Sequence, residues 1–136
     1  STAANPSHTY AAGSYAARLT VTDNLSAPST SAPITITADA PPPAQPTLLT
    51  LAKSAVSGGS STTATVTVSS AAGVTLALAS SNTAVASVPA TVVIPIGATR
   101  ATFTVRTSNV RRDTVVTLTA TANGATATAR LTVRAR

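Results

Sequence analysis

The segment TVVTLTATANGATATARLTV, residues 114–133, restricts the possible folds more than any other part of the sequence. Asn123-Gly124 at its centre is the strongest short hairpin signal, because a type I′ turn requires positive φ at both central residues. With this turn, four apolar pairs share one side of the hairpin: Val116 with Leu131, Leu118 with Ala129, Ala120 with Ala127 and Ala122 with Ala125. A register shift of one residue would move this apolar side to solvent. The sequence therefore predicts an antiparallel hairpin with one defined register.

Short strand-like runs, separated by turn residues, fill the rest of the chain from residue 46 onward. Thr and Val dominate these runs, and a branched Cβ suits the pleated surface of a strand. Strands are expected at 48–53, 63–69, 74–79, 84–88, 91–94, 101–107, 114–122 and 125–134. Gly58-Gly59 is expected to form a hairpin-type turn. So many short strands in so short a segment predict an all-β fold, an Ig-like antiparallel β-sandwich over residues 46–136.

The composition predicts a thin core of small residues. Charged residues make up 9% of the chain and aromatic residues 2%. Phe103 alternates with Val105 along its strand and is expected to be the one aromatic side chain of the sandwich core. The sequence contains no cysteine, so it predicts neither disulfides nor thiol chemistry. It also contains no apolar run long enough for a transmembrane segment.

A proline-rich stretch, ADAPPPAQPT at residues 38–47, predicts a boundary within the chain. Pro41, Pro42 and Pro43 restrict φ and favour an extended polyproline II conformation, which forms a semi-rigid spacer. We expect an interdomain linker at residues 40–46, between a segment at 1–39 and a complete domain at 47–136.

Two strand-like runs precede this linker, residues 15–22 and 33–37, with a loop expected at 23–32. Tyr15, Leu19 and Val21 share one face of the first run, and Ile34 and Ile36 share one face of the second. Two strands alone do not bury an apolar face, because an isolated hairpin is marginally stable in water. We therefore expect upstream residues, the sandwich folded back, or another protein chain to cover this face. The stiff linker disfavours the fold-back.

The same region resembles a known family of domains. The residues that carry the resemblance are His8-Thr9-Tyr10, Gly13, Tyr15, Leu19, Val21, Asp23-Asn24 and Ile34-Thr35-Ile36. They follow the closing strands of PKD domains, Ig-like sandwiches of exported proteins, although Ala17 replaces a larger apolar residue. The resemblance covers residues 7–38. It implies that residues 1–39 are the C-terminal strands of an incomplete PKD-type sandwich, whose earlier strands precede Ser1.

Residues 47–135 resemble a bacterial Ig-like domain that occurs in tandem in large secreted proteins. The resemblance rests on the Gly-Gly turn, on a Thr/Val strand, and on the stretches LASSNTAVASVP and IPIGATRATFTV. It implies a modular, non-catalytic and exported protein with a periplasmic, cell-surface or extracellular location.

The reactive side chains are few and scattered. His8 is the only histidine, and the three acids, Asp23, Asp39 and Asp113, lie in separate turns or the linker. Glycoside hydrolysis uses two acids that flank one bond, and a calcium site usually uses several carboxylates. We therefore predict no catalytic, metal or cofactor-binding residues, no cofactor, and no enzyme activity.

The net charge of +6 raises the question of a nucleic-acid partner. Most arginines occur singly at alternating strand positions, as solvent-facing residues do, and only Arg111 and Arg112 are adjacent. No exposed aromatic platform accompanies them, so nucleic-acid binding is not expected. Tyr10 and Tyr15 are expected to pack within the protein rather than to stack on sugars.

These observations predict a non-catalytic structural or interaction module of a bacterial exported protein, which spaces or docks other components. Its expected partners are other protein chains that cover the PKD-like strands. Two alternatives stay open. The chain could be a carbohydrate- or cell-surface-binding module, with a glycan site in loops 80–83 and 108–113. It could also be an accessory structural subunit of a larger envelope complex.

Overall fold

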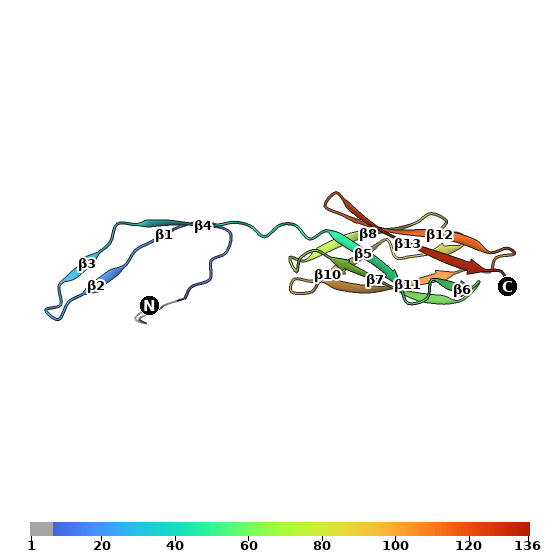
Figure 1. Ribbon diagram of the computed structural model, residues 1–136, viewed down its shortest axis with the longest axis horizontal. Helices are drawn as coiled ribbons and strands as arrows, with labels where there is room; N and C mark the ends of the chain where they lie inside the picture. The colour runs from blue at the N-terminus through green and yellow to red at the C-terminus, as the bar shows by residue number, and fades with distance from the viewer. Residues whose placement is uncertain (1–6) are drawn as a thin grey trace. The chain divides into compact units, whose positions relative to one another are not determined.

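The computed structural model describes residues 7–136, and within this range the regular elements are strands only (Figure 1). The predicted all-β class is confirmed. The chain divides into two compact units, Ser1–Pro41 and Pro42–Arg136.

The second unit is a sandwich of two sheets, which confirms the predicted Ig-like antiparallel β-sandwich. The five-stranded sheet has the order β10-β8-β12-β13-β6, and the four-stranded sheet has the order β5-β7-β11-β9. All pairs are antiparallel except β13 with β6. The strands are β5 (Pro46–Leu51), β6 (Ala55–Ser57), β7 (Ser61–Val68), β8 (Val74–Ser80), β9 (Ala86–Ser87), β10 (Thr91–Ile94), β11 (Arg100–Thr107), β12 (Thr114–Ala122) and β13 (Ala125–Arg134).

The core of the sandwich lies between the sheets and consists of medium-sized aliphatic side chains. Buried and exposed residues alternate along β7 and β11, as expected for strands with one face on a core. Phe103 is 7% exposed and contributes the aromatic ring that the sequence predicted for this core. The largest fully buried side chains are Leu76, Ile94, Leu118, Leu131, Val66, Val105, Val116 and Val133.

The predicted β12–β13 hairpin is confirmed in turn and register. Val116 pairs with Leu131 and Ala122 with Ala125, as the apolar pattern required. The turn residues Asn123 and Gly124 have φ of 49° and 77°. Turn chemistry and side-chain pattern therefore select the same pairing.

The prediction of a hairpin turn at Gly58-Gly59 is wrong. The short strand β6 precedes these glycines and pairs in parallel with β13, whereas β7 follows them in the other sheet. The turn, closed by a 3.1 Å hydrogen bond from Ser60 N to Ser57 O, therefore connects the two sheets. Three residues with one buried side chain, Val56, are too few for an alternation that reveals a strand.

The sandwich includes residues that the sequence analysis assigned to the linker. Ala44 is 1% exposed, and its carbonyl oxygen accepts a 2.8 Å hydrogen bond from Asn123 Nδ2. Gln45 Nε2 donates to the carbonyl oxygen of Asn123 at 3.0 Å. The hairpin turn thus holds the chain that leads into β5, and the second unit begins at Pro42.

The first unit is one long hairpin built from two ribbons in succession. β1 (Gly13–Ala17) pairs with β4 (Ile34–Ala38), and β2 (Thr20–Thr22) pairs with β3 (Pro28–Thr30). β3 lies inside the predicted loop at 23–32, so that part of the loop prediction is wrong. Pro28 occupies a two-stranded ribbon, where it needs no ladder hydrogen bond on its outer side.

The tip of this hairpin is closed by Asp23. Its Oδ1 accepts hydrogen bonds from Leu25 N and Ala27 N, both at 2.9 Å. Ser26 in the same turn has a positive φ of 64°. An aspartate that bonds the backbone ahead of it is a common turn former, and here it fixes the β2–β3 connection.

Replacement of Gly124 with valine should destabilise the sandwich by about 1–3 kcal/mol, because a β-branched residue is strained at positive φ. No atom lies within 4 Å of the position that a Cβ would take, so backbone strain alone would cause the loss. The check is the melting temperature, with roughly 4–8 °C expected for each kcal/mol. Gly124→Asn is the control, since asparagine tolerates this conformation. Equal melting temperatures for the two variants would contradict the argument.

Residues 42–136 should unfold cooperatively in the absence of residues 1–41, because the sandwich has its own core. The shorter segment 46–136 lacks Ala44 and Gln45 and therefore loses both hydrogen bonds with Asn123. Its stability should be lower by about 1–3 kcal/mol. Thermal melts of the two segments test this. The boundary would be wrong if residues 42–136 gave a molten product that residues 1–41 rescued.

Candidate interaction surfaces

One face of the first unit carries apolar side chains that the other described residues of this unit leave open. Tyr15 pairs with Ile36 and Ala17 with Ile34, so these four side chains share a face. Leu19 continues this face toward the tip of the hairpin. The exposed large side chains of the unit are Leu19 (65%), Val21 (55%), Leu25 (83%) and Ile34 (67%). We call Tyr15, Leu19, Val21, Ile34 and Ile36 the hairpin face.

The backbone pairing determines which side chains lie on the hairpin face and which lie on the opposite face. Leu19 N donates to Ser31 Oγ at 3.0 Å, and Ser31 N donates to the Leu19 carbonyl oxygen at 2.8 Å. Between β1–β4 and this pair, the return strand has one extra residue near Ala32-Pro33, which shifts the register before the pairing continues in β2–β3. Threonines gather on the opposite face, where the Oγ1 atoms of Thr20 and Thr30 lie 3.1 Å apart. The two faces therefore differ sharply in polarity.

Three aromatic rings cluster beside β1. His8 and Tyr10 make an edge-to-face contact with centroids 4.5 Å apart, and Tyr10 and Tyr15 lie 4.7 Å apart. The Tyr15 hydroxyl donates to the Ala11 carbonyl oxygen at 3.0 Å. The tyrosine rings thus contact each other, in line with the expected packing role. The lone histidine contributes to the same cluster.

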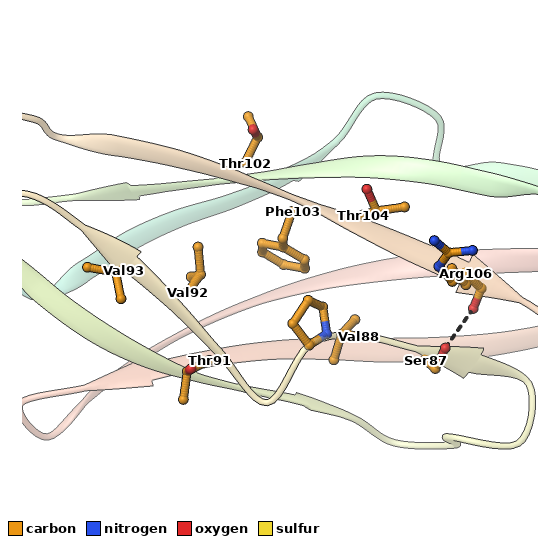
Figure 2. A pocket seen from close by; sticks show the side chains of 10 residues that line it. Ser87, Val88, Thr91, Val92, Val93, Thr102, Phe103, Thr104 and Arg106 are labelled. Carbon is orange, nitrogen blue, oxygen red and sulfur yellow. Dashed lines mark hydrogen bonds between the residues drawn. The ribbon is translucent and has the colours of Figure 1, made fainter.

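A groove opens in the sandwich between β10 and β11 (Figure 2). β9 ends after two residues, and the chain then crosses from the four-stranded sheet to the five-stranded sheet, where it forms the edge strand β10. This crossing leaves a groove of about 590 Å³. Its lining residues are Ser87, Val88, Pro89, Thr91, Val92, Val93, Thr102, Phe103, Thr104 and Arg106.

The floor of the groove is apolar and one end is cationic. Figure 2 shows the Phe103 ring directed from β11 toward Val88 and Val92, with Arg106 at the end of the strand. Ser87 Oγ donates a long 3.5 Å hydrogen bond to the Arg106 carbonyl oxygen beside it. No pattern in the sequence indicates this groove. Its residues come from three strands, and their proximity depends on the point at which the chain changes sheets.

The two loops considered for a glycan site lie at the same end of the sandwich. Residues 80–83 begin at the last residue of β8, and residues 108–113 follow β11. Ser108 N donates to the Val85 carbonyl oxygen at 2.9 Å, which joins the segments next to these loops. Thr117 N donates to Ser81 Oγ at 3.0 Å, so the first loop is also tied to β12.

Two of the acidic side chains, Asp23 and Asp113, accept hydrogen bonds from backbone N–H groups. Asp23 closes the hairpin tip, and Asp113 Oδ1 accepts a 2.8 Å hydrogen bond from Ala135 N. These two residues belong to different units. Among residues 7–136, no three His, Cys, Asp or Glu side chains gather as a metal site would need. The same residues include no helix long and apolar enough to cross a membrane.

Comparison with known proteins returns neither a protein-family model nor a curated sequence that matches this chain. The resemblances to PKD and bacterial Ig-like domains therefore stay hypotheses that rest on the motifs described above.

The hairpin face should bind a hydrophobic dye such as anilinonaphthalene sulfonate, because it exposes apolar side chains in the isolated chain. Leu19→Thr/Ile34→Thr should lower the dye fluorescence. Thr20→Ser/Thr35→Ser, on the opposite face, should leave it unchanged. An equal decrease with both double variants would show that the dye does not report on this face.

Proposed function

We propose that this chain is a non-catalytic structural or interaction module of a bacterial exported protein, and that it spaces or docks other components. One observation carries the proposal: the first unit is apolar on the hairpin face and threonine-rich on the opposite face, and residues 7–41 by themselves leave the hairpin face open. An apolar sheet face of this kind marks an interaction site. Its partner is a protein surface that supplies the missing apolar layer.

The geometry of the first unit supports this partner class. A two-stranded ribbon gains stability when a third strand or a second layer covers its apolar face. Leu19, Val21 and Ile34 stand in a row that such a layer can cover, whereas charged groups are absent from the face. Burial of aliphatic side chains would then supply most of the binding free energy.

The exported location rests on the family resemblances of both units. The scattered positions of His8, Asp23 and Asp113 support a role without catalysis. Tyr10 and Tyr15 contact each other, which favours a structural role for them over sugar stacking.

The hairpin face also supports a second candidate, an accessory structural subunit of a larger envelope complex. In that case the partner would be a permanent neighbour. Co-purification that survives high salt would favour this candidate, because apolar contacts are not screened by ions, whereas contacts between exposed charges are.

Site-specific photocrosslinking in the native assembly tests the proposal. A photoreactive phenylalanine analogue is placed at Leu19 or Val21 on the hairpin face, and at Thr20 or Thr22 on the opposite face as matched controls. We expect crosslinks to a protein chain from the first pair and few from the second. Crosslinks of equal yield from both faces, or crosslinks to glycan alone, would reject the proposed protein partner.

A further inference from the structure

The second unit carries a separate feature that the proposed function does not use, an uncovered edge of β11. On one side, β7 pairs with β11 from Arg100 to Arg106. On the other side, within residues 7–136, the ladder partner is β9, which reaches only Arg106 and Thr107. The preceding residues of β11 therefore have an open edge.

Two hydrogen bonds show which backbone groups face this edge. Thr107 N donates to the Ser60 carbonyl oxygen at 3.0 Å, and Val68 N donates to the Thr99 carbonyl oxygen at 2.9 Å. In an antiparallel pair, residues bonded to the partner alternate with residues whose N–H and C=O groups point away. Odd-numbered residues of β11 thus bond to β7. Thr102 and Thr104 direct their backbone groups to the open edge.

The open edge borders the groove between β10 and β11. A strand added beside β11 would place every second side chain over Phe103 and Val92, on the apolar floor (Figure 2). The other side chains would lie on the outer face, beside Thr102 and Thr104. One site therefore offers backbone hydrogen bonds and an apolar slot, the combination used in strand-addition recognition.

Charge identifies the kind of strand that fits. Arg100 and Arg106 are exposed and flank the open edge on its outer face. Because β9 occupies the edge at Arg106, two copies of this chain could pair through antiparallel β11 edges only over the residues before it. Such a pairing centred on Thr102 would bring each Arg100 diagonal to the other copy's Arg106, and like charges this close across a strand pair repel each other. An incoming strand with acidic residues at these places would gain an attraction instead.

We propose that the groove binds an extended peptide segment of a partner protein, which adds as a strand to the open edge of β11. The segment continues the line of β9, places β-branched or other aliphatic side chains over Phe103, and carries acidic residues near Arg100 and Arg106. This site is independent of the hairpin face.

The register of β11 specifies a probe. In the antiparallel hexapeptide Val-Asp-Val-Thr-Val-Asp, the valines face the groove, and the two aspartates lie diagonal to Arg106 and opposite Arg100. The measurement is amide hydrogen exchange by NMR on the full chain, with and without the peptide. We expect the peptide to slow exchange at Thr102 and Thr104. The peptide with lysine in place of both aspartates should not slow it.

Two protein variants separate the parts of the interaction. Arg100→Gln/Arg106→Gln should weaken binding of the aspartate peptide roughly fivefold. A peptide with asparagine in place of both aspartates should bind this variant and the unaltered protein with the same affinity. Arg111→Gln/Arg112→Gln removes the same charge elsewhere and is the matched control. Thr102→Pro removes a backbone donor at an edge position where proline is tolerated, so the variant should fold and lose peptide binding, whereas Thr102→Val should keep it.

Several results would overturn the proposal. One is that the amide hydrogens of Thr102 and Thr104 exchange as fast with the aspartate peptide, at its solubility limit, as without it. Another is an equal loss of affinity in the Arg111/Arg112 control, which would indicate a general charge effect. A third is perturbation of the groove by a neutral hexasaccharide and not by the peptide, which would make the groove a glycan site.

Discussion

The two sheets of the sandwich and the β1–β4 ribbon alternate apolar and polar residues, so each has one face that must be covered. In the second unit, two sheets cover each other, and medium-sized aliphatic side chains such as Val66 and Leu118 fill the space between them. In the first unit, the same alternation gives the hairpin an apolar side that residues 7–41 by themselves leave open. The covered apolar faces stabilise the sandwich, and the open apolar face is the basis of the proposed role of the hairpin.

Asn123 has two functions in the second unit. It adopts the positive φ that the β12–β13 turn needs, and its side chain and carbonyl group bind Ala44 and Gln45. The turn that sets the register of the central hairpin thus also holds the entry to β5. This double role explains why the sandwich extends back to Pro42 although prolines dominate the sequence there.

The two candidate surfaces differ in the physics of recognition. The hairpin face offers aliphatic side chains such as Leu19 and Ile34, and its partner has to supply a complementary apolar layer. The β11 edge offers backbone hydrogen bonds, a narrow apolar slot and flanking cations, so its partner has to be an extended strand with acidic residues. A module with both surfaces could connect two different components, which agrees with a spacing or docking role.

Local patterns in the sequence determined the positions of the longer strands, the register of β12 with β13 and the apolar side of residues 15–22, because alternation and turn chemistry act between residues that are close in the chain. The short strands β3 and β6 carry too few residues for such a pattern. The tertiary structure alone decided three other features. They are the parallel pairing of β6 with β13, the anchoring of Ala44 by Asn123, and the groove above Phe103. Each depends on contacts between distant segments, and each involves a strand or turn too short for a periodic signal. The packing of the two layers determines where β9 ends and the chain changes sheets. Because β9 ends there, the preceding residues of β11 have an open edge.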